Sequence, residues 1–399
     1  MILPQGIQDA NFYELIKYAL LQKGYPSIAD FIREAPNYWY DEQVWKELFP
    51  MEAYENPTRA FEQRIGDAYV PVMAVYLADD AETPLITNSG AERVTGEIPR
   101  MGHGFLFSSK SYEDARKLIR AGADAVVNSA YDAFSLDVMK LIQGIHAKRT
   151  FTALQVESQG YYLATKQNNN GGLDNFKINM NPKAENMKGA GGFGKRGAKS
   201  VYSSTDANPI GDLQDMFEYG WRNNLLSADY TKSVTRMSDA QWEAIKNHAS
   251  VKKAVAMWKT GYLAGVDNLA AVNITDGDLN NYLASLKVPA VSVSKEYGFR
   301  EKLNKDTQRI EKVAAPAFAE NTIVMRPAGA MGKTQWSKVS NIFSTPEVPM
   351  YYTEGGAIAI QEDTNARAKG KKFSVESLCV PVPTAIDRVL YLNTAEAAK

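Results

Sequence analysis

Two stretches of the chain combine glycines with a lysine in the manner of phosphate-binding loops. Residues 188–196, KGAGGFGKR, read from Gly189, satisfy G-x-G-x-x-G and all but the last position of G-x-x-x-x-G-K-[ST]. At that last position Arg196 replaces the hydroxyl residue that would bind magnesium. Residues 327–334, PAGAMGKT, keep the Gly-Lys-Thr ending but begin with Pro327. Both stretches are incomplete versions of a nucleotide-binding motif.

The surroundings of these stretches do not favour nucleotide binding. A phosphate loop lies between a strand and the N-terminus of a helix, whose free amides bind the anion. The residues before Gly189, KINMNPKAENMK, do not predict a buried strand, and those after Arg196 do not predict a helix. The second stretch follows a fair strand pattern, but only a weak helix pattern, QWSKVSNIF, comes after it.

The first stretch is therefore interpreted as a mobile, glycine-rich surface loop. It carries a local excess of positive charge, opposed in the sequence by Glu185. Such a loop could contact nucleic-acid phosphates independently of base sequence, or another subunit. The predicted basic site of this DNA-facing or inter-subunit loop consists of Lys183, Lys188, Lys195, Arg196 and Lys199.

Other patterns of catalytic or metal-binding residues are missing from the sequence. The histidines His103, His146 and His248 are far apart and lack the spacing of a zinc site, and Cys379 is the single cysteine. An acidic cluster at residues 79–82 is typical of a solvated loop. We therefore expect no enzyme activity, no cofactor and no metal site.

The composition is that of an ordinary soluble globular protein. The 399 residues are 45% hydrophobic and 23% charged, with a formal net charge of -1. No signal peptide or membrane-spanning segment is visible, so we expect no membrane partner. The single cysteine fits a reducing compartment.

The N-terminal half predicts short helices, an extended arm and one long helix. Short helical patterns lie within residues 9–65, and each must pack against something else in the chain or in another chain. Extended runs at 69–78 and 92–99 predict a two-stranded arm. From Ser111 to Lys148 one apolar stripe predicts a helix of about 55 Å, or two helices broken near Gly122 or Gly144. Periodicity is lost from 151 to 204.

The C-terminal half mixes helices and strands without a regular strand–helix–strand rhythm. Helices are predicted from Asp212, after the capping pair Ser238 and Gln241, and near residues 275–286. The last third is rich in strands, in the stretches NTIVMRPAG, GGAIAIQE, KFSVESLCVPVP and DRVLYLNT. This mixture predicts an α+β fold.

The order of these elements resembles the major capsid protein of tailed double-stranded DNA phages, with the Hong Kong 97-type fold. Three stretches look like its lambda-type branch: NPIGDLQDMFEYG with MSDAQWEAIKNHASVKKAV, NTIVMRPAGAMGKTQW, and KFSVESLCVPVPTAIDRVLYLNT. The similarity covers roughly residues 65 to 399.

The resemblance implies a division of the chain into five parts. They are an N-terminal arm (1–64), an extended β-hairpin loop (65–107), a peripheral domain with a long spine helix (108–235), an axial domain (236–340), and a C-terminal β segment (341–399) that returns to the peripheral and axial core.

The resemblance also implies a function and partners. The chain would assemble with itself into hexamers and pentamers of an icosahedral shell, in a virion assembled in the bacterial host cytoplasm. Scaffolding, portal and decoration proteins would be partners, and packaged double-stranded DNA would be contacted non-specifically. Some members of this fold join subunits covalently through a loop lysine. No lysine lies between Lys46 and Lys110 here, so we expect no such crosslink from this arm.

Two alternatives remain open from the sequence. A cellular nanocompartment, an encapsulin-like shell around protein cargo, would use the same fold. A P-loop-like nucleotide-binding enzyme would use Lys195 or Lys333, and ATP or GTP binding would identify it.

Overall fold

The computed structural model describes residues 12–34, 43–65, 92–107, 123–166, 168–169, 175–260, 273–304, 309–339, 349–365 and 370–398. The predicted strand at 69–78, the acidic cluster Asp79, Asp80 and Glu82, and the predicted helix start at Ser111 lie outside these residues.

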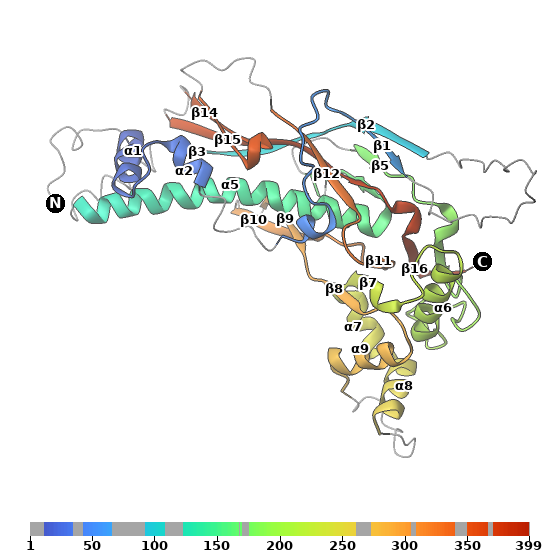
Figure 1. The fold of residues 1–399 in the computed structure, drawn as a ribbon. Coiled ribbons are helices and arrows are strands. Elements are labelled where there is room, and N and C mark those ends of the chain that lie inside the picture. The colour runs from blue at the N-terminus through green and yellow to red at the C-terminus, as the bar shows by residue number, and fades with distance from the viewer. Residues whose placement is uncertain are drawn as a thin grey trace, which may run out of the picture.

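A single long helix, α5 (Ala123–Gln159), crosses the molecule (Figure 1). Its 37 residues correspond to about 55 Å at 1.5 Å per residue. The helix is not broken at Gly144. A Cβ there would lie 2.3 Å from Nε2 of His103, which itself lies 2.7 Å from the Leu141 carbonyl oxygen. Gly144 therefore allows a strand to approach the helix closely.

The predicted end of this helix at Lys148 was wrong, because the helix continues for eleven more residues to Gln159. Most side chains after Ile145 are buried on every side, among them Phe151, Leu154 and Val156. A helix buried all round loses the one-sided apolar pattern on which the prediction depended. Gly160, with φ +72°, ends the helix in the left-handed conformation, and its amide donates to the Val156 carbonyl.

The N-terminal helices pack within the same chain. They are α1 (Phe12–Gln22), α2 (Ile28–Glu34) and α3 (Val44–Leu48). Apolar residues of α1 and α2 share one core with α5 and the strands above it, and that core includes Ile16, Leu20, Phe31, Ile32, Phe134, Val138, Ile142 and Phe373. The expectation that these helices need a support is thus met by α5 and its sheet.

One sheet lies along α5 on its upper side in Figure 1. Its strands are β12 (Gly332–Ser337), β15 (Gly370–Pro383), β14 (Ile358–Asn365), β13 (Met350–Thr353) and β3 (Arg100–Phe107), the last paired with β15. The first half of β15 alternates, with Phe373 and Val375 facing the core. Its second half, from Ser377 to Pro383, is buried on both faces, as expected for a central strand.

A second sheet and four helices form the other end of the molecule. The sheet order is β6 (Met187–Ala190), β16 (Leu390–Ala397), β11 (Thr322–Pro327), β7 (Ser233–Ser238) and β8 (Val291–Ser294). The helices are α6 (Pro209–Arg222), α7 (Asp239–Asn247), α8 (Ala249–Thr260) and α9 (Asp276–Ser285). The predicted start of α6 at Asp212 was late, because Asn208 caps the helix by accepting from the Gly211 amide.

Only one half of the capping box predicted at Ser238 and Gln241 is formed. Ser238 caps α7 through the Gln241 amide, as expected, but the Gln241 side chain accepts from Thr394 instead. A complete capping box occurs at α9, between Thr275 and Asp278.

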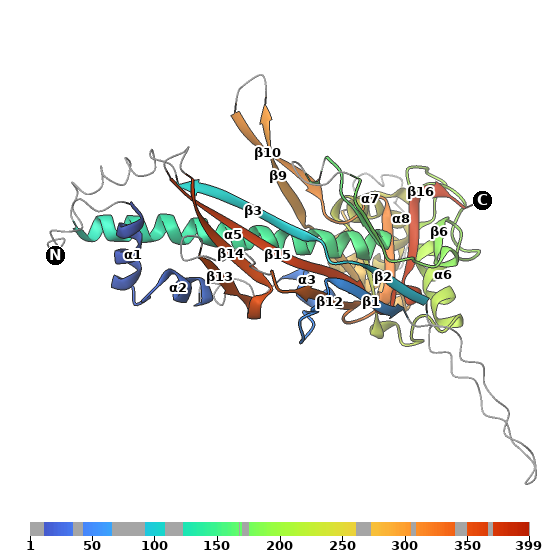
Figure 2. The ribbon, with the colours of Figure 1, turned by 90° about the horizontal axis from the view of Figure 1, so that it is seen from above.

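Three pairs of strands stand apart from the larger sheets. They are β1 (Ala60–Ile65) with β2 (Glu92–Glu97), β4 (Tyr161–Leu163) with β5 (Lys177–Asn179), and β9 (Tyr297–Asn304) with β10 (Arg309–Pro316). Residues 60–65, expected among short helices, form a strand because β2 pairs with them. The β9–β10 hairpin was not predicted, and Figure 2 shows it projecting sideways from the body.

The predicted α+β class is confirmed by these helices and mixed sheets. Within the described residues, no helix is both long and apolar enough to cross a membrane.

Candidate functional site

The glycine-rich loop begins at the end of a strand, contrary to prediction. Strand β6 pairs in parallel with β16, and a Cβ on Gly189 would lie 2.6 Å from the Glu396 carbonyl oxygen. The strand was missed because it is short and lies at the edge of its sheet. The chain then runs irregularly to α6, so the loop does lie between a strand and a helix.

The amides of the loop are already bound to carboxylates of the same chain. The Gly191 amide donates to Asp212 Oδ1 at 2.7 Å, and the Arg196 and Gly197 amides donate to Asp215 Oδ2 at 2.6 and 3.0 Å. Both acids lie on α6, whose cap Asn208 also donates to the Arg196 carbonyl at 2.7 Å. These three amides therefore bind two internal carboxylates, whose negative charge would repel a phosphate.

The glycines of the loop are required by this packing. A Cβ on Gly197 would lie 1.8 Å from Asp212 Oδ1, and one on Gly194 would lie 2.4 Å from the Asp215 carboxyl carbon. The interpretation as a mobile loop was wrong, since these hydrogen bonds fix the loop to α6. The same hydrogen bonds argue against the nucleotide-binding alternative for Lys195.

Asp212 is the electrostatically unusual member of this arrangement. It is only 1% exposed, and burial raises the pKa of its carboxyl group to about 6, although the Gly191 amide favours the ionised form. The buried Tyr202 hydroxyl lies beside it, and burial raises the pKa of Tyr202 well above its ordinary value. A buried carboxyl group with a raised pKa is a candidate acid or base. In this structure the hydrogen bond of the Asp212 carboxyl group is to the Gly191 amide of the loop.

The five predicted basic residues have different surroundings. Arg196 forms ion pairs with Asp215 at 3.1 Å and Glu218 at 2.5 Å, which fasten the loop to α6. The turn at Gly191 and Gly192 lies close to Lys188 and Lys199, and Lys195 is exposed. Lys183 precedes a short 3-10 turn before β6. The structure thus places four of them, Lys188, Lys195, Arg196 and Lys199, around one loop.

The second motif is a strand connection that supports the N-terminal segment. Met331 and Thr334 amides donate to the Leu48 and Pro50 carbonyls, each at 2.8 Å, and the Thr334 hydroxyl donates to the Phe49 carbonyl at 2.6 Å. Lys333 pairs with Glu52 at 2.9 Å. Residues 335–337, the start of the weak helix pattern, belong instead to strand β12, because β15 pairs with them, and residues 340–343 lie outside the described part of the chain. The groups that would bind nucleotide are occupied by protein.

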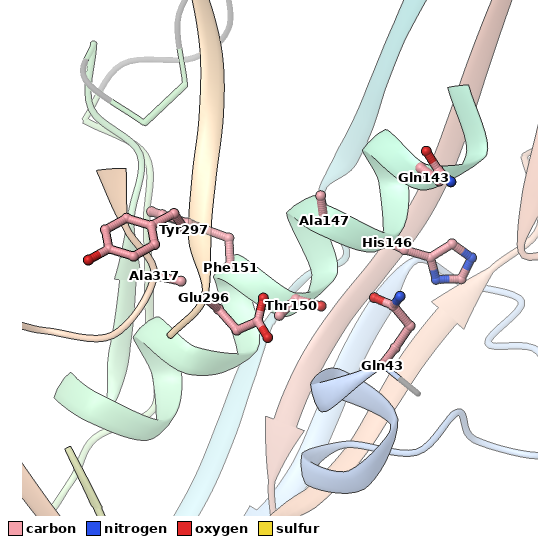
Figure 3. Close-up of a pocket in the computed structure, with 9 residues that line it drawn as sticks. All are labelled: Gln43, Gln143, His146, Ala147, Thr150, Phe151, Glu296, Tyr297 and Ala317. Carbon is pink, nitrogen blue, oxygen red and sulfur yellow. The ribbon is translucent and has the colours of Figure 1, made fainter. Parts of the chain in front are cut away.

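A cavity of about 200 Å³ lies between α5, the residue before α3 and the root of the β9–β10 hairpin (Figure 3). It is lined by Gln43, Gln143, His146, Ala147, Thr150, Phe151, Glu296, Tyr297 and Ala317. The Thr150 side chain is 6% exposed, and its hydroxyl has no hydrogen-bond partner in the described part of the chain. The cavity is therefore lined partly by polar side chains, and at least one of them, Thr150, has a hydroxyl group without a hydrogen-bond partner among the described residues.

His146, at the wall of this cavity, belongs to a buried network. Trp45 donates from Nε1 to His146 Nδ1 at 3.2 Å, so the imidazole proton lies on Nε2, which is 3.0 Å from Glu354. Arg149 pairs with the same Glu354 at 2.6 Å and donates to Ser377. Burial lowers the pKa of His146, because the imidazolium form is poorly solvated there. This network holds α3 and the sheet against α5.

A second buried network joins α5 to the other sheet. Glu157, fully buried on α5, pairs with Arg326 of β11 at 2.6 Å and Arg236 of β7 at 3.1 Å. These residues were not predicted from the sequence, since one glutamate at a helical position has no distinguishing pattern. In the sequence, the one sign of Glu157 was a glutamate directly after a mainly apolar run, FTALQV.

Lys148 also has an altered proton affinity. Burial lowers its pKa to about 8, and its ammonium group donates to the Tyr162 hydroxyl at 2.6 Å and the Asn168 carbonyl at 3.2 Å. These contacts hold the segment after α5 against the helix, which is a structural role. No cluster of metal-ligating side chains occurs among the residues that the structure describes.

Comparison with known proteins finds similarity only at the level of structure. No protein-family model and no curated protein matches the chain. A prophage protein of Escherichia coli assigned as a capsid protein is 13% identical, with a TM-score of 0.48, over 96% of this chain and 99% of the other. A phage-related protein of Bordetella bronchiseptica is 13% identical, with a TM-score of 0.43, over 91% and 95%. The capsid of Ralstonia phage GP4 is 11% identical, with a TM-score of 0.41, over 88% and 86%.

Proposed function

We propose that the chain is a phage major capsid protein, which assembles through hexamers and pentamers into an icosahedral shell around double-stranded DNA. The observation that carries this proposal is the plan of the subunit. Two separate hydrophobic cores share residues of one 37-residue helix. Ion pairs of Glu157, which is buried, and of Glu354, which is part-buried, join that helix to the second and the first sheet. Such an elongated unit suits lateral packing in a thin layer.

The parts of the subunit take their proposed roles from the resemblance. Residues 1–64 would be the N-terminal arm, and 65–107 the extended loop, whose strand β2 pairs with β1 at the end of the arm. Residues 108–235 would be the peripheral domain, 236–340 the axial domain, and 341–399 the returning β segment. Strands β15 and β16 of this segment pair with earlier strands in two different sheets, which supports this last assignment.

The basic loop is proposed as a surface that faces DNA or a neighbouring subunit. The proposed contact residues are those predicted from the sequence, Lys183, Lys188, Lys195, Arg196 and Lys199, of which Arg196 also pairs with Asp215 and Glu218. Scaffolding, portal and decoration proteins are proposed partners in a virion assembled in the bacterial host cytoplasm.

Electron microscopy with sedimentation, on protein expressed alone and with a candidate scaffolding protein, tests this function. Closed shells, tubes or five- and six-membered rings are expected. A protein that stays monomeric under both conditions contradicts the proposal. Shells that co-purify with protein cargo and without DNA would favour the nanocompartment, and ATP or GTP binding would favour the enzyme.

A further inference from the structure

The β9–β10 hairpin is fixed to the body at its root, on the face that includes Gly298. At its root, a Cβ on Gly298 would lie 2.6 Å from the Phe151 ring of α5. The Ala317 amide donates to the Glu296 carbonyl at 3.0 Å, and Gln155 donates to the Ala317 carbonyl at 2.7 Å. These contacts hold the root of the hairpin, while Figure 2 shows the strands extending away from the body.

The opposite face is apolar near the root and charged further out. Successive residues of a strand alternate between faces, and residues paired across the hairpin share a face. The exposed face therefore consists of Tyr297, Phe299 and Glu301 on β9 with Pro316, Ala314 and Lys312 on β10. Phe299 is 70% exposed and Tyr297 is 47% exposed. A two-stranded hairpin of this kind is only marginally stable in water by itself.

The cavity of Figure 3 opens at the same root. Glu296 and Tyr297 line it, and the buried Thr150 hydroxyl lacks a hydrogen-bond partner among the described residues. Glu296 is exposed and forms no ion pair within the described part of the chain. The aromatic side chains Tyr297 and Phe299 are complementary to an apolar surface. The adjacent Glu296 carboxylate is complementary to a cation on that surface.

We infer that this face of the hairpin, together with the cavity, is a contact surface for a second copy of the chain. This inference rests on the proposed function. A second copy has a nearly neutral net charge of -1, so little long-range repulsion opposes its approach. An exposed lysine or arginine of that copy would pair with Glu296. The neighbour would cover Phe299 and place a cationic side chain against Glu296.

Thiol labelling in Phe299→Cys protein tests the contact. The native Cys379 is buried and gives a low background, so the new thiol is the accessible one. A maleimide should react with position 299 at least about tenfold more slowly in assembled particles than in unassembled protein. In protein expressed alone, a benzophenone attached at this thiol should then link two chains. Tyr54→Cys, at a position 82% exposed, is the matched control for reagent access.

The possible outcomes separate this inference from the proposed function. Equal labelling rates at position 299 in particles and in unassembled protein, or equal slowing at positions 54 and 299, overturn the inference and leave the shell intact. Absence of any particle from the wild type contradicts the proposed function itself. If Phe299→Cys subunits fold without assembling, hydrogen exchange of residues 297–304 and 309–316 in wild-type particles decides. Slower exchange than in free subunits supports the contact, and unchanged exchange overturns it.

Discussion

Glu157 and Arg326 form a buried ion pair, with Oε1 and Nε 2.6 Å apart. Arg236 lies on the other carboxylate oxygen, so one acid on the long helix opposes two guanidinium groups on neighbouring strands. A charge that is buried away from water is strongly destabilising unless a group of opposite charge is buried beside it. This arrangement links the orientation of α5 to that of the second sheet.

Replacing Glu157 by Gln should therefore destabilise the subunit strongly. The change leaves two buried guanidinium groups without a counter-charge, which costs about 3–5 kcal/mol. Urea unfolding of unassembled subunits measures the loss. Asp137→Asn is the control on the same helix, because its exposed pair with Lys140 should contribute less than about 0.5 kcal/mol. Equal losses of unfolding free energy in the two variants would contradict a special contribution of the buried Glu157 ion pairs.

Replacing Asp212 by Asn should stabilise the subunit at neutral pH. Burial raises the pKa of Asp212 to about 6, above its ordinary value of 3.8, so ionisation costs stability in the folded state. The favourable neutral form is fully present below pH 3.8 and is lost as the pH rises through 6. The gain in unfolding free energy should be up to about 3 kcal/mol at pH 7.5 and should vanish below pH 4. Urea titrations at several pH values test it.

Asp215→Asn is the matched variant, three residues later on the same helix, and should have the opposite sign. Asp215 accepts two loop amides and pairs with Arg196, so loss of its charge should cost about 1–2 kcal/mol at pH 7.5. If both variants were destabilised alike at that pH, the assignment of Asp212 as an unfavourably ionised group would be wrong.

Gly144→Ala should destabilise the protein despite the higher helix propensity of alanine. The new methyl group would overlap His103, which must move and lose its contact with the Leu141 carbonyl. We expect a cost of about 1–2 kcal/mol in place of the usual gain of about 1 kcal/mol. A double-mutant cycle with His103→Ala measures the coupling. The alanine should become favourable once the imidazole is absent, and additive effects would exclude the clash.

Mature particles should lack covalent links made by a lysine of the extended arm. No lysine occurs between Lys46 and Lys110, so this segment has no amine nucleophile for an isopeptide bond. Boiling particles in denaturant should release single chains on a gel. A ladder of covalent multimers would contradict the prediction, and mass spectrometry of the linked peptides would identify the residues responsible.

The local patterns in the sequence determined most of the individual elements. The apolar stripe predicted the long helix, the alternating runs predicted β14, β15 and β16, and Ser238 predicted the start of α7. These features depend on propensity, capping and solvent exposure, which act over a few neighbouring residues. The sequence context predicted no strand before Gly189 and no helix directly after Arg196, and the short strand β6 was missed.

Tertiary structure decided the features that depend on distant residues. The helix continues to Gln159 because its surroundings bury every side of it, and residues 60–65 are a strand because β2 pairs with them. The glycine-rich loop is fixed because Asp212 and Asp215 lie under its amides. Glu157 acquires two partners from strands that are 79 and 169 residues away in the chain. No local pattern records such contacts, since their energy depends on which groups the fold brings together away from water.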